Sequence, residues 1–265
     1  MRLAWAAVVA AAIAALGASS ALADSTPPAT PAALTTPAVT ATVQQPAAQR
    51  TAAQSSATFH VQKVFPAAGQ LLVTGVAART KPSPRASVIK VMHQFRPDFR
   101  IQEILAVATR TGTDGKPWYK ISVPMRPNGT MGWIPARSVK LAATAGQIVV
   151  HRNSRTIDLY WHNKLMLQAK VAVGATGMET PPGRYYVAAR FVPYQEPFLG
   201  VFAVETSAYS KLSEWPGGGV VGIHGTDQPQ LLGQAVSHGC VRVANTTAAA
   251  LVKLAPLGTP ILITD

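Results

Sequence analysis

Apolar and polar residues alternate over short runs between residues 70 and 142, and turn signals separate the runs. Asp114-Gly115 and Asn128-Gly129 are tight-turn pairs flanked by alternating apolar positions, as in β-hairpins. The pattern predicts five short strands that form a small β-barrel in this region.

A second region, from residue 146 to residue 265, has the same β character and one helical stretch. The runs "QIVVHRNSRTIDLYW" and "KLMLQAKVAVGA" predict a hairpin that turns at His162-Asn163. The run "NTTAAALVKLAPLG" predicts a helix that Asn245 caps and that stops at Pro256 and Gly258. The closing "TPILITD" predicts a buried strand. We expect a mostly β domain with one or two helices.

The first 58 residues do not have the composition of a folded domain. Residues 1–23 carry a positive charge at Arg2, continue with an apolar run and end in Ala-Leu-Ala, which predicts a secretory signal peptide cleaved after Ala23. A retained membrane anchor is the alternative; after cleavage we expect no membrane span. Residues 24–58 consist largely of Ala, Thr, Pro, Gln and Ser, and predict a disordered tether.

The chain is strongly basic and contains one cysteine. Its net charge of +13 becomes +12 when residues 1–23 are removed, because only Arg2 is lost. The Lys and Arg residues are scattered and the chain is expected to be exported, so anionic cell-envelope polymers are expected partners and nucleic acid is not. A single cysteine in an exported chain forms no internal disulfide; it forms a bridge to another molecule, is a free reactive thiol, or is a small buried residue.

The residues around Cys240 favour a reactive thiol. The apolar run "VVGI" delivers His224 at its end, and a histidine can take the thiol proton and stabilise the thiolate as an ion pair. In an extended segment, Cys240 and Arg242 share one face, while Val241 and Val243 share the other; Val236 is expected to pack inward with these valines where Gly239 breaks the alternation. Arg242 is either a clamp for a substrate carboxylate or a solvated surface residue.

Two alternatives to this pairing come from the other candidate residues. His238 is a second candidate base, a substrate contact or a structural hydrogen-bonding residue. A zinc site of His224, His238 and Cys240 lacks a further ligand at recognisable spacing, so no metal and no cofactor are expected.

The stretch "HGTDQPQLLGQAVSHGCVRV" resembles the signature of the L,D-transpeptidase catalytic domain, and "TPPGRYY" resembles the segment that precedes it in that family. The resemblance covers residues 146–265 and implies a β-sandwich. It implies that Cys240 is the nucleophile, that His224 is the base and that the Gly225 carbonyl orients the imidazole. Backbone N–H groups near Gly239 would form the oxyanion hole. The residues that would shape the substrate site are Ser237, His238 and Arg242; one form of the family pattern has Asn at the position of Arg242.

The first region, residues 70–142, resembles bacterial Src-homology-3-like domains in its order of elements, and this likeness implies a wall-binding module. Trp118, Tyr119 and Trp133 either line a peptide groove there or belong to the barrel core. A papain-like arrangement is excluded because no histidine follows Cys240.

The two resemblances together predict an exported peptidoglycan L,D-transpeptidase of the periplasm or cell wall, acting on stem peptides. The alternatives are an L,D-carboxypeptidase and an inactive wall-binding protein.

Overall fold

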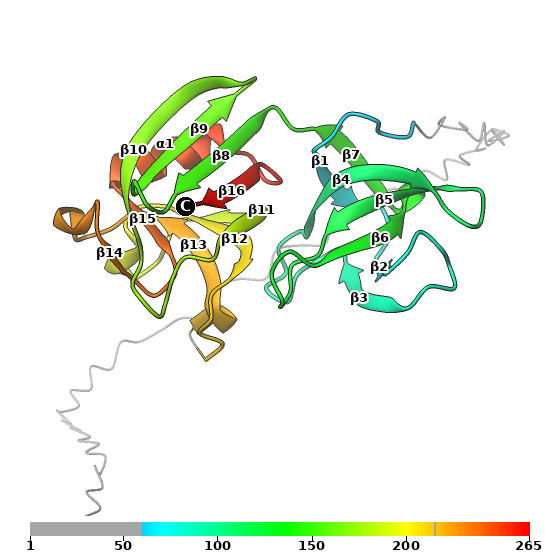
Figure 1. Ribbon diagram of the computed structural model, residues 1–265, viewed down its shortest axis with the longest axis horizontal. Coiled ribbons are helices and arrows are strands. Elements are labelled where there is room, and N and C mark those ends of the chain that lie inside the picture. Colours follow the sequence, from blue (N-terminus) through cyan, green and yellow to red (C-terminus); the bar gives the residue numbers. More distant parts are fainter. Residues whose placement is uncertain (1–59, 215) are drawn as a thin grey trace, which may run out of the picture. The chain divides into compact units, whose positions relative to one another are not determined.

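The computed structural model describes residues 60–214 and 216–265. The predicted signal peptide (1–23) and tether (24–58) lie outside this range. The described residues fall within one compact unit, which contains two β-sheets (Figure 1). None of the described helices is long and apolar enough to cross a membrane.

The first sheet has seven strands, in the order β3-β2-β6-β5-β4-β1-β7. Their bounds are β1 Ala67–Leu71, β2 Gly75–Arg79, β3 Val88–His93, β4 Glu103–Thr111, β5 Pro117–Ser122, β6 Met131–Pro135 and β7 Val139–Ala143. The prediction of five strands was therefore too low. The stretch "LLVTGVAAR", which begins at Leu71, is split between β1 and β2, and Leu72 and Val73 are exposed in the connection. The likeness to Src-homology-3-like domains stays a prediction.

The three aromatic side chains of the first sheet have different environments. Trp118 and Tyr119 are buried, with 2% and 1% of their surface exposed, and Tyr119 packs in the core of this sheet. The Trp118 indole donates a hydrogen bond to Asp114 at 3.0 Å. Trp133 is half-buried and lines a surface cavity. Of the three, Tyr119 therefore belongs to the core, and Trp133 remains available at a surface.

The second sheet has nine strands, in the order β14-β10-β15-β13-β12-β11-β16-β8-β9. Their bounds are β8 Gly146–His151, β9 Thr156–Trp161, β10 Lys164–Gly174, β11 Gly183–Phe191, β12 Ala203–Tyr209, β13 Val220–His224, β14 Ala235–Ser237, β15 Val241–Val243 and β16 Pro260–Thr264. The hairpin at His162-Asn163 is confirmed: both residues have positive φ, as a type I′ turn requires. One α-helix, α1 (Asn245–Leu254), and four short 3₁₀ helices complete the described part, so a mostly β fold is confirmed.

The predicted cap of α1 is wrong. The N-cap residue is Ala244, and no side chain caps the helix. The Asn245 side chain instead accepts hydrogen bonds from the N–H groups of Val201 and Thr226, both at 3.2 Å. These two bonds satisfy the Asn245 oxygen in the neighbouring loops, so it is not used for capping.

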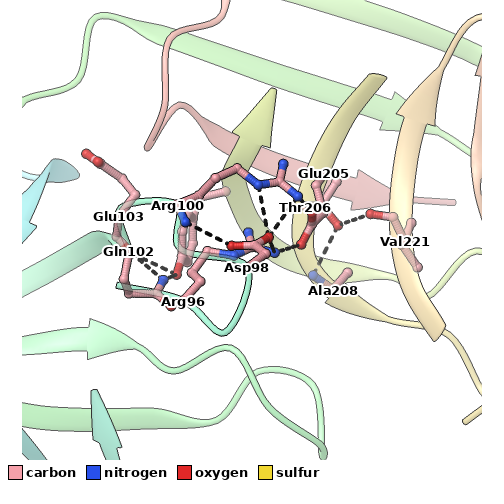
Figure 2. Close-up of polar contacts among 10 residues, drawn as sticks. Arg96, Asp98, Arg100, Gln102, Glu103, Glu205, Thr206, Ala208 and Val221 are labelled. Carbon is pink, nitrogen blue, oxygen red and sulfur yellow. Dashed lines mark hydrogen bonds and ion pairs between the residues drawn. The ribbon is translucent and has the colours of Figure 1, made fainter. Parts of the chain in front are cut away.

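Polar contacts join the first sheet to β12 of the second. Arg96, in the β3–β4 connection, forms an ion pair with Glu205 of β12, and Asp98 and Arg100 extend this cluster (Figure 2). The Asn128 amide donates to the Tyr209 carbonyl at 2.7 Å and accepts from the Tyr209 N–H at 2.9 Å. These two bonds occupy the backbone N–H and carbonyl of Tyr209, the last residue of β12, as hydrogen bonds from a neighbouring strand would.

Candidate active site around Cys240 and His224

Two short parallel strands bring the candidate residues together. His224 ends β13 and Cys240 immediately precedes β15, and the pairs Ile223–Val241 and His224–Arg242 lie side by side in the parallel ladder. The buried Val241 and Val243 hold β15 against the core, as their alternation predicted. Residues sixteen positions apart in the sequence, His224 and Cys240, therefore become neighbours, because β15 begins opposite the last residues of β13.

The His224 imidazole is buried and held in one orientation. Only 4% of its surface is exposed, and Nδ1 lies 2.6 Å from the carbonyl oxygen of Gly225. Because a carbonyl only accepts, Nδ1 carries the proton and the lone pair of a neutral ring is on Nε2. Burial lowers the pKa of His224 from its ordinary 6.5 to about 4, opposed by the Gly225 carbonyl and assisted by the charge of Arg242.

The half-buried Cys240 thiol faces the same space as this imidazole. Its Sγ accepts a hydrogen bond from the Gly222 N–H at 3.3 Å. A Cβ placed on Gly222 would lie 3.7 Å from His224 Cδ2 and 3.9 Å from Cys240 Sγ, so the two side chains border one point. Gly222 is thus a contact of the sulfur that the sequence analysis missed, although its place two residues before His224 on a strand puts both on one face.

The electrostatics of the pair favour neutral groups. Burial raises the pKa of the Cys240 thiol, while the Gly222 N–H and the charge of Arg242 act in the opposite direction. Burial disfavours both the thiolate and the imidazolium, so the free protein holds a thiol beside a neutral imidazole. The ion pair expected from the sequence is not the favoured resting state. Among the described residues, Arg242 is the cation whose charge affects the pKa of both groups, and the β13–β15 ladder pairs it with His224.

The segment from Ser237 to Cys240 is fixed by its own hydrogen bonds. The buried Ser237 hydroxyl donates to the Cys240 carbonyl at 2.6 Å and accepts from the Gly239 N–H at 3.2 Å. Gly239 has φ +116°, and a Cβ there would lie 2.9 Å from Cβ of Ser210. Only glycine fits this position without strain. Since Ser237 occupies the Gly239 N–H, an oxyanion role for Gly239 remains a prediction.

Asn245 positions the loop after His224. A Cβ on Gly225 would lie 2.1 Å from Asn245 Oδ1, so the amide rests directly on the Gly225 backbone. Gly225 in turn supplies the carbonyl that orients His224. The sequence analysis missed this role because Asn245 stands where a helix cap is expected. No signal in one sequence separates the two uses.

The remaining candidates around the Cys240–His224 pair are His238, the residues considered as metal ligands and Thr180. His238 precedes Gly239 and is exposed, whereas Ser237 and His224 are buried. In the part of the chain that the structure describes, no group of three or more His, Cys, Asp or Glu side chains is arranged to hold a metal ion. Thr180, in the Thr-Pro-Pro-Gly segment, accepts from the Gly174 N–H at 2.9 Å and fixes the strand that borders Ser237.

These features define a β-sheet domain with a cysteine and a histidine at the ends of adjacent parallel strands. Residues 145–263 match the YkuD family, described as the L,D-transpeptidase catalytic domain. This part of the chain is therefore similar to the L,D-transpeptidase catalytic domain.

Two curated relatives match a part of the chain of similar length. It is 33% identical over 118 residues to "Putative L,D-transpeptidase YkuD" of Bacillus licheniformis, covering 44% of this chain and 65% of that protein. The protein of the same description from Bacillus subtilis is 33% identical over 116 residues, covering 44% and 64%. The chain thus spans less than two thirds of the length of these relatives.

Among solved structures, an L,D-transpeptidase from Mycobacterium tuberculosis H37Rv matches 77% of this chain and 98% of its own, with 15% identity and a TM-score of 0.42.

Proposed function

We propose that the protein is an exported peptidoglycan L,D-transpeptidase in which Cys240 is the nucleophile. The observation that carries the proposal is the space beside Gly222, which the Cys240 sulfur and the His224 ring both border. It lies in a domain that matches the L,D-transpeptidase catalytic domain. Export, the acceptor and the assignment of each residue to a chemical step belong to this proposal.

In the first half-reaction, Cys240 attacks the carbonyl of the third stem residue of a tetrapeptide. His224 Nε2 takes the thiol proton as the C–S bond forms, because the free pair is neutral. Among the described residues His224 and Cys240 share no hydrogen bond, and this proton transfer requires the Cys240 thiol to come within hydrogen-bond distance of His224 Nε2. His224 then protonates the amine of the terminal D-alanine, which leaves, and a thioester remains on Cys240.

In the second half-reaction, an amine of a neighbouring stem attacks the thioester. His224 removes the proton of this amine, the C–S bond breaks, and Cys240 regains a proton. The Gly222 N–H stabilises negative charge on the sulfur when it attacks and when it leaves. The positive charge of Arg242 acts in the same direction, in addition to any contact with a substrate carboxylate.

Incubation with purified disaccharide-tetrapeptides, followed by mass analysis of the products, tests this proposal. Cross-linked dimers support transfer between stems. Tripeptide monomers alone would support the alternative, an L,D-carboxypeptidase that transfers the acyl group to water. Unchanged substrate would support the remaining alternative, an inactive wall-binding protein. The presence of both Cys240 and His224 in one site argues against this alternative. The Cys240→Ala protein is the control for each outcome.

A further inference from the structure

A cationic cavity lies beside Trp133 on the first sheet. Its volume is about 860 Å³, and every residue that lines it lies between residues 80 and 133. Four of the lining residues are cations and none is an acid; the cations are Lys81, Arg85, Arg110 and Lys120. We call this the Trp133 cavity.

The four cations of the Trp133 cavity are not neutralised by the protein. Elsewhere in the described residues Arg96, Arg152 and Lys211 each have a carboxylate partner. No described acid forms an ion pair with any of the four cavity cations. Like charges around one concave surface repel each other and concentrate a positive potential, and a bound anion relieves this repulsion.

The walls of the cavity are fixed by hydrogen bonds within the first sheet. Arg79 donates to the Ala86 carbonyl at 2.6 Å and ties down the β2–β3 connection. Thr113, in the β4–β5 turn, donates its N–H to the Pro82 carbonyl at 3.0 Å and its hydroxyl contacts Ser83 Oγ at 2.8 Å. The two loops that carry the lining residues are therefore bound to each other, and the cavity exists before a ligand arrives.

An aromatic ring forms part of the cavity wall. The Arg110 guanidinium lies 6.0 Å from the centroid of the Trp133 ring, at the limit of a cation–π contact. Trp133 is also the one of the three predicted groove aromatics that is not buried. Arginine presents a planar fork that suits carboxylates, and an indole face suits the apolar parts of a peptide or sugar.

We propose that the Trp133 cavity binds carboxylate groups of a peptide-bearing polymer at a site separate from Cys240. The identification of this polymer as peptidoglycan rests on the proposed function, since the stem peptides that the catalytic domain would act on carry free carboxylates. Holding one stretch of such a polymer on the first sheet raises the local concentration of neighbouring stems at Cys240. The recognised chemistry is a series of carboxylates on a flexible chain.

Calorimetric titration of the full chain with poly-glutamate, in the Cys240→Ala background, tests the proposal. One variant replaces the four cavity cations with glutamine: Lys81→Gln, Arg85→Gln, Arg110→Gln and Lys120→Gln. A matched control removes four exposed cations that also lack ion pairs and lie outside the cavity: Lys140→Gln, Lys164→Gln, Lys170→Gln and Arg184→Gln. We expect the cavity variant to bind about tenfold more weakly or worse, and the control less than about threefold more weakly.

Three results would overturn the proposal. Equal losses in the two variants would mean that poly-glutamate responds to net charge alone. If the parent protein does not measurably bind poly-glutamate, the Trp133 cavity is not a carboxylate site. Tighter binding of inorganic polyphosphate than of poly-glutamate, lost in the same cavity variant, would make it a phosphate site.

A separate measurement tests the identification of the polymer as peptidoglycan, independently of whether the cavity binds carboxylates. Sedimentation with purified peptidoglycan uses the same inactive background, so its outcome does not depend on catalysis. If the cavity variant loses poly-glutamate binding but sediments with peptidoglycan like the parent, the carboxylate site stands and its assignment to the wall polymer is wrong.

Discussion

The buried His224 makes the stability of the fold depend on pH. Its pKa is about 4 in the folded protein and about 6.5 in an unfolded chain, because burial disfavours the imidazolium. The unfolded chain therefore takes up a proton first as the pH falls. The contribution of His224 is fully present above pH 6.5 and is lost between pH 6.5 and pH 4. Linkage gives a loss of about 2 kcal/mol at pH 5 and about 3 kcal/mol at pH 4.

Urea denaturation at pH 7.5, 5 and 4 measures this contribution when the protein is compared with His224→Asn. Asparagine keeps a donor near the Gly225 carbonyl and does not titrate. Other titrating groups are common to both proteins and cancel in the difference. We expect the unfolding free energy of the parent to fall by about 2 kcal/mol more than that of the variant at pH 5. Equal slopes for the two proteins would refute the burial of a neutral His224.

Three further predictions concern Cys240, Asn128 and Asn245. Since burial raises the pKa of the Cys240 thiol, its alkylation by iodoacetamide should keep accelerating as the pH rises past about 8.5. Asn128→Ala removes both hydrogen bonds to Tyr209 and should lower the unfolding free energy in urea by about 1–3 kcal/mol. Asn245→Ala frees the loop that holds Gly225, so kcat for transfer should fall about tenfold or more, with a smaller change in KM.

Each of these predictions has its own control and contrary result. Cys240→Ser should take up no label, and a rate that levels off below pH 7 would contradict the raised thiol pKa. Replacing the exposed Asn153 with alanine should leave the unfolding free energy unchanged. If Asn153→Ala lowers it as much as Asn128→Ala does, the hydrogen bonds from Asn128 to Tyr209 do not account for the loss. Asn245→Asp keeps the acceptor oxygen and should restore most of the activity; failure of this rescue would mean that Asn245 acts in another way.

The sequence predicted the parts of the fold that depend on local patterns. The turn at His162-Asn163 was predicted because two strand-like runs flank this pair of residues, and the positive φ of both residues confirms it. The alternation of Val241 and Val243 likewise predicted the buried face of β15. The division between β1 and β2 was missed, since Leu72 and Val73 are apolar residues in an exposed connection and no local signal marks them as such.

The sequence predicted which residues form the candidate site, but not the burial and hydrogen bonds around them. The sequence placed His224 and Cys240 together through a resemblance, whereas their shared space, the Gly222 N–H on the sulfur and the neutral state of the pair depend on tertiary burial. The Asn245 contact depends on loops far apart in the sequence. Such a contact cannot be read from spacing, because Asn245 also suits a helix start.

Intact-mass measurement of the protein mixed with disaccharide-tetrapeptide tests whether Cys240 is the nucleophile. We expect an adduct on Cys240 equal in mass to the donor less its terminal D-alanine, absent in Cys240→Ala and discharged when an amine acceptor is added. Turnover of the substrate by Cys240→Ala at the rate of the parent protein, or an adduct at any residue other than Cys240, would contradict it.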